Sequence, residues 1–167
     1  KFGADLDNVC DAVSHSLVAM VVGIHFGGTV LAFGLLAAAA ILIRVVQRVD
    51  PSYVTGTGTA TNELMRHLLL ILLLRESYGF DATPYLAAVY ILNSASMLAP
   101  FAMPHLVRSK AKTTTAIFLV NMALVIAWYV PSTVPFLAAV FFGTYLYSFM
   151  IAGAAWHRGG MIRIHRG

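Results

Sequence analysis

The side chains that could carry chemistry are a few histidines and arginines within or beside apolar runs. His25 lies in a run without charged residues that extends from 17 to 43. The other candidates are Arg66, His67 and Arg75. A histidine in such surroundings can ligate haem iron, relay protons or donate a hydrogen bond. His25 is therefore a candidate cofactor ligand, and a hydrogen bond to a neighbouring carbonyl is the alternative interpretation.

Arg66 and His67 have an acidic neighbour in the sequence. Glu63 precedes them by three and four residues, which is the spacing of neighbours on one helix face. Arg75 follows Arg66 at about 13 to 14 Å along a helix axis, so both lie at bilayer depth if this helix crosses a membrane. We expect these four side chains to make buried polar contacts, or contacts with lipid or a partner. The alternative is that the arginines anchor a short, tilted helix at the interfaces.

The sequence lacks the patterns of common enzyme classes. It contains no Gly-rich phosphate loop, HExxH helix, GxSxG elbow or paired acidic site. Cys10 is the only cysteine, which excludes an intrachain disulfide and a metal site built on several thiolates. All seven acidic residues lie outside the clean apolar runs, which argues against a hydrolase or an ion-coupled transporter. We therefore predict no enzyme activity, no metal and no cofactor other than the haem considered for His25.

The composition indicates a protein that is surrounded by lipid. Of the 167 residues, 59% are hydrophobic and 11% charged, against about 45 to 50% apolar and about 25% charged in a soluble domain. The mean hydropathy is +0.80. The net charge of +4 does not indicate nucleic acid, because the basic residues stand in short clusters between apolar runs.

Five segments are predicted to cross the membrane in one all-α, polytopic helical bundle that occupies 1–167. A spanning helix needs about 20 mainly apolar residues. The predicted spans are 17–43, 62–80, 84–104, 114–130 and 134–156. The first ends at Arg44 and Arg48, whose stems can reach the headgroups. The second is short, because only 68–74 is free of polar residues, and Pro131 and Pro135 bracket a tight turn between the last two.

The distribution of basic residues decides whether 62–80 crosses. Short inner loops of membrane proteins collect Lys and Arg. If 62–80 crosses and the N-terminus is outside, the inner side holds Arg44, Arg48, Arg66, Arg108, Lys110, Lys112, Arg158, Arg163 and Arg166. If it does not cross, Arg108 to Lys112 falls on the side opposite Arg44 and Arg48. We therefore predict five spans, with the N-terminus outside and the C-terminus on the positive inner side.

Three glycines in the first predicted span lie on one helical stripe. Gly23, Gly27 and Gly34 are offset by four and seven residues, and both offsets return to nearly the same face. A stripe of small residues lets another helix approach closely. We predict helix packing through these glycines, with a cofactor slot as the alternative.

Two segments with histidine resemble a known family. The stretch 14–27, with His15 and His25, and the pair Arg66 and His67 resemble the haem-carrying membrane anchors of succinate dehydrogenases. In that family an arginine directly follows the histidine, whereas Phe26 follows His25 in this chain. The site of that family is therefore not carried over.

These observations predict a non-catalytic structural or accessory subunit of a multi-subunit complex in the mitochondrial or bacterial inner membrane, of respiratory or ATP-synthase type. Small-residue faces would pack against other subunits, and basic loops would bind anionic phospholipids such as cardiolipin. One alternative is an anion or small-solute channel or transporter lined by Arg66, His67 and Arg75. The other is a haem- or quinone-binding membrane anchor that uses His25.

Overall fold

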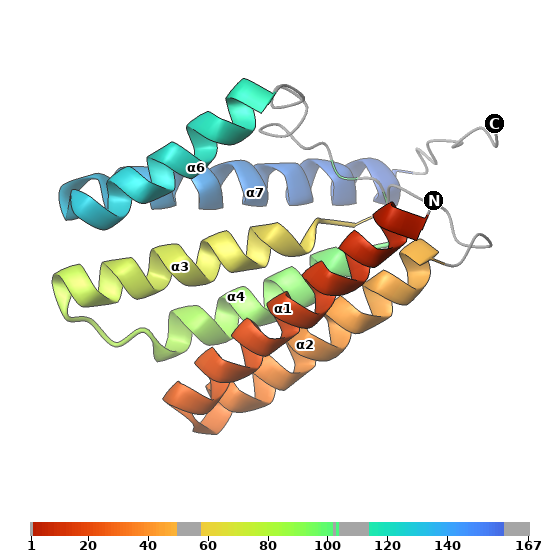
Figure 1. The fold of residues 1–167 in the computed structure, drawn as a ribbon, viewed down its shortest axis with the longest axis horizontal. Coiled ribbons are helices and arrows are strands. Elements are labelled where there is room, and N and C mark those ends of the chain that lie inside the picture. The colour runs from red at the N-terminus through yellow and green to blue at the C-terminus, as the bar shows by residue number, and fades with distance from the viewer. Residues whose placement is uncertain (1, 50–57, 102, 104–113, 159–167) are drawn as a thin grey trace. The chain divides into compact units, whose positions relative to one another are not determined.

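The computed structural model describes residues 2–49, 58–101, 103 and 114–158. Within these ranges it contains six α-helices, one 3-10 turn and no strand (Figure 1), which confirms the predicted all-α fold. The elements are α1 (Phe2–Phe26), α2 (Gly28–Val49), α3 (Thr61–Tyr78), α4 (Thr83–Met97), α6 (Thr114–Tyr129), η1 (Pro131–Thr133) and α7 (Val134–His157).

Three of the described segments are long and apolar enough to cross a bilayer. They are Leu6–Phe26, Gly28–Val49 and Pro131–His157, and a shorter apolar helix covers Phe118–Tyr129. Such lengths match the thickness of the hydrocarbon core. The chain therefore has the helices of a membrane-embedded protein, as its composition predicts.

The predicted single helix over 17–43 is wrong, because the chain turns back within it. α1 ends at Phe26 and α2 begins at Gly28. Gly27 has φ +67° and Gly28 has φ +48°, a left-handed conformation that glycine adopts without a steric penalty. The two helices then pack along each other as an antiparallel hairpin (Figure 1).

This hairpin brings the start of α1 beside the end of α2. Arg48 Nη1 donates to Asn8 Oδ1 at 3.4 Å, so the start of α1 and the end of α2 lie at the same end of the hairpin. The predicted side of the N-terminus stays a prediction. The glycine pair reverses the direction of the chain. The hydropathy of an apolar run without charges does not reveal such a turn.

Gly23 and Gly34 form the closest approach between α1 and α2. A Cβ atom on Gly34 would lie 2.9 Å from the carbonyl oxygen of Ala19 and 3.3 Å from Gly23 Cα. Glycine at this point lets the two backbones touch. Gly27 lies in the turn, so the three glycines do not form one stripe, and the close packing is internal to the chain.

Contacts within the chain divide it into two compact units. Unit 1 comprises Lys1–Leu68, Thr83–Ala102 and Ile162–Gly167, and unit 2 comprises Leu69–Ala82 and Met103–Met161. In unit 1, α2 packs against both α1 and α4. The hydroxyl of Tyr90 on α4 donates to the carbonyl oxygen of Ala19 on α1 at 2.8 Å, which links these two helices as well. The single domain predicted over 1–167 stays a prediction.

In unit 2, α6 and α7 form a hairpin through η1. Their bounds agree within one residue with the predicted segments 114–130 and 134–156. Pro131 begins the turn because its fixed φ suits a first helical position. The buried core contains Leu70, Ala127, Val134, Ala138 and Phe141.

Candidate functional site

Buried polar side chains gather around the C-terminal end of α4 in unit 1. They are Arg44, Thr59, His67, Asn93 and Ser96, and none is more than 5% exposed. Polar groups inside a membrane protein must find their hydrogen-bond partners within the protein. We call these five residues the polar cluster, and it is the strongest candidate site in the described residues of unit 1.

The polar cluster completes the last turn of α4. Pro100 has no N–H to donate to the carbonyl oxygen of Ser96, which explains why α4 ends at Met97, well before the predicted residue 104. The backbone N–H of Thr59 donates to the Ser96 oxygen instead, at 3.0 Å. Arg44 Nη1 donates to the carbonyl oxygen of Met97 at 2.8 Å. A cation is also favoured at the negative end of a helix dipole.

Gly58 lies against the end of α4 and must be glycine. Its φ is +65°, and its N–H donates to the carbonyl oxygen of Phe101 at 3.0 Å. A Cβ atom here would overlap the Met97 oxygen and would lie 2.7 Å from Arg44 Nη1 and 2.8 Å from the Ser96 oxygen. No side chain fits at this position without moving backbone.

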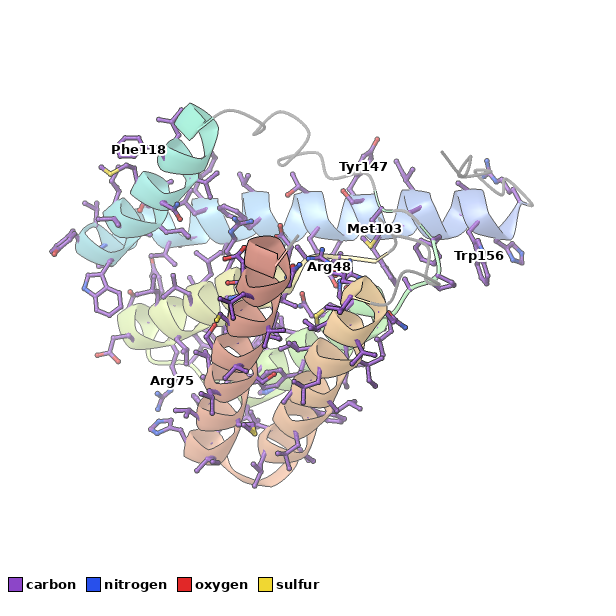
Figure 2. All side chains as sticks on the ribbon, turned by 45° about the vertical axis from the view of Figure 1, so that its right-hand side comes forward. Arg48, Arg75, Met103, Phe118, Tyr147 and Trp156 are labelled. Carbon is purple, nitrogen blue, oxygen red and sulfur yellow. The ribbon has the colours of Figure 1, made fainter. Side chains whose placement is uncertain are left out.

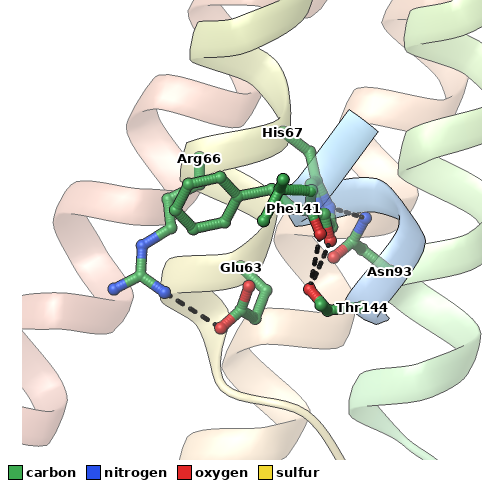
Figure 3. Close-up of polar contacts among 7 residues, drawn as sticks. Glu63, Arg66, His67, Asn93, Phe141 and Thr144 are labelled. Carbon is green, nitrogen blue, oxygen red and sulfur yellow. Dashed lines mark hydrogen bonds and ion pairs between the residues drawn. The ribbon is translucent and has the colours of Figure 1, made fainter. Parts of the chain in front are cut away.

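Hydroxyl and amide groups extend the polar cluster from Thr59 to His67. The hydroxyls of Thr59 and Ser96 lie 2.8 Å apart. Ser96 donates its proton to the carbonyl oxygen of Asn93 at 3.1 Å, so Thr59 is the donor to Ser96. The Asn93 amide nitrogen donates to the Val89 oxygen at 2.9 Å and contacts His67 Nδ1 at 3.1 Å (Figure 3).

The contact with Asn93 assigns the tautomer of His67. Because the amide nitrogen can only donate, Nδ1 must accept, and a neutral ring then carries its proton on Nε2. The donation to Val89 fixes which end of the Asn93 amide faces the ring. Asn93 Oδ1 is buried and has no hydrogen-bond partner among the described residues.

The structure separates the four predicted polar residues of α3. Arg66 Nη1 pairs with Glu63 Oε1 at 3.0 Å, and both side chains are partly exposed (Figure 3). His67 points instead into unit 1, toward Asn93. Arg75 is exposed near the end of the helix (Figure 2). It lies about two and a half turns from Arg66, on the opposite side of α3, so the two arginines do not line one path along this helix.

His25 lies in the last turn of α1, beside the hairpin turn, and its side chain is exposed. Its ring packs edge to face against Phe26, with the ring centroids 5.1 Å apart. In the described part of the chain, no group of three or more His, Cys, Asp and Glu side chains is placed to hold a metal ion. A cofactor at His25 stays a prediction.

Sequence reasoning missed the residues that matter most in the polar cluster. Arg44 was expected to extend toward the headgroups, and the structure buries it. Pro100 signals only that the carbonyl oxygen of Ser96, four residues earlier, lacks its helical donor, and Thr59 donates to that oxygen. Arg44 donates to Met97 instead, and no local pattern in the sequence indicates that contact.

The hydrogen bonds of the polar cluster join separate segments of unit 1. The bonds of Arg44 and Thr59 join α2 and the segment before α3 to the end of α4. The cluster contains no carboxylate and no thiol. Comparisons of the chain with protein-family models, curated proteins and solved structures find no match, so the interpretation depends on this geometry.

Proposed function

We propose that this chain is a non-catalytic helical subunit of a multi-subunit membrane assembly, and that the polar cluster stabilises its fold. The observation that carries the proposal is that Arg44 and Thr59 donate to the last carbonyls of α4. A transport or catalytic site would instead present buried polar groups to a substrate. We place this assembly in the inner membrane of mitochondria or bacteria. The basic segments of the chain would bind anionic phospholipids there.

The proposed topology has six crossings, with both termini on the inner side. It is supported by the reversal at Gly27, which places the start of α1 beside Arg48. The other basic segments keep the sides predicted from the charge distribution. Among the arginines of the described residues, Arg75 alone then lies at the outer end of a helix.

Two short helices favour an assembly over a free monomer. α3 has 18 residues and α4 has 15, or about 27 and 22 Å along their axes. These lengths fall below the hydrocarbon thickness of about 30 Å, and short helices are accommodated by thinner lipid or by association with other helices. Neighbouring subunits would supply that association.

Copurification from native membranes tests this proposal. We expect the tagged chain, extracted in mild detergent, to bring down other membrane subunits in fixed ratio. Arg44→Ala should lower the yield of the complex because it removes a donor from the end of α4. Arg48→Ala is the matched control: it removes an exposed arginine one turn further along α2, and the yield should not change.

Two outcomes would contradict the proposal. One is a stable monomer with an activity of its own. The other is anion flux in liposomes that Arg75→Ala abolishes, since this would favour the channel predicted from Arg66, His67 and Arg75. A haem spectrum of the purified chain would favour the membrane-anchor alternative at His25.

A further inference from the structure

We draw no further inference here: the strongest candidate, the buried pair of His67 and Asn93 between α3 and α4, in which Asn93 Oδ1 has no hydrogen-bond partner among the described residues, belongs to the polar cluster already described, and nothing in unit 1 shows which group donates to that oxygen.

Discussion

The burial of the Arg44 guanidinium in the polar cluster is explained by what it contacts. Arg44 Nη1 reaches the carbonyl oxygen of Met97 at the end of α4, where the helix dipole is negative and backbone acceptors lack their usual donors. Charge-assisted hydrogen bonds of this kind are stronger than neutral ones. Arg44 therefore meets, at a helix end, the acceptors that a buried cation requires.

Gly58 provides the sharpest test of that contact. Gly58→Ala should lower the free energy of unfolding by about 3 kcal/mol, because it combines left-handed backbone strain with overlap at the Met97 oxygen. Gly79→Ala is the matched control. Gly79 has nearly the same φ, +67°, but nothing lies within 4 Å of a Cβ atom there, so only the strain of about 1 to 2 kcal/mol applies.

Thermal unfolding in detergent, followed by circular dichroism, measures both variants. Equal losses at Gly58 and Gly79 would show that the close approach to α4 contributes nothing. In that case the role assigned to the polar cluster is wrong.

Local contacts could be predicted from the sequence, and contacts through space could not. The pair of Glu63 and Arg66 follows from a spacing of three residues on one helix. The burial of Arg44 depends on the end of α4 and on Gly58, which lie far from it in the sequence. No local pattern states that these segments meet.

At the scale of elements, the α1–α2 hairpin shows the limit of reading hydropathy alone. The run from 17 to 43 contains no charged residue. A glycine pair inside it does not lower the mean hydropathy of the run enough to indicate a turn. α1 then extends back to Phe2, well before the predicted start of the span at residue 17. The hairpin of α6 and α7 was predictable because Pro131 and Pro135 mark its turn.

The close approach inside this hairpin predicts a second pair of variants. Gly34→Ala should reduce stability by about 1 to 3 kcal/mol, because the new methyl group meets the backbone oxygen of Ala19 at 2.9 Å. Gly143→Ala in α7 is the control, since nothing lies within 4 Å of its Cβ position and alanine favours a helix. It should leave stability unchanged or raise it slightly. Unfolding in mixed detergent micelles compares them, and a harmless Gly34→Ala would contradict the tight contact.

At the scale of the whole molecule, the number of crossings sets the side on which each segment lies. A single helix over 17–43 would place the N-terminus and Arg48 on opposite sides of the membrane. The hairpin places them together, as the contact between Asn8 and Arg48 indicates. The side of the N-terminus therefore distinguishes the two arrangements.

Labelling of single cysteines with a membrane-impermeant maleimide tests the six-crossing topology. In a Cys10→Ser background, Asp7→Cys and Val49→Cys should react from the same side, and Thr29→Cys should react from the other. All three positions are exposed. Reaction of Asp7→Cys and Val49→Cys from opposite sides would restore the single helix and exclude the hairpin.

The hydrogen bonds that Arg44 and Thr59 donate to the end of α4 have a consequence for how the protein is synthesised. Arg44 and Thr59 precede α4 in the chain, so a ribosome synthesises these donors before the carbonyls that they serve. The contact of the Arg44 guanidinium with the Met97 carbonyl therefore forms only after 53 further residues have been synthesised. Biogenesis of unit 1 is thus complete only when its last helix end arrives.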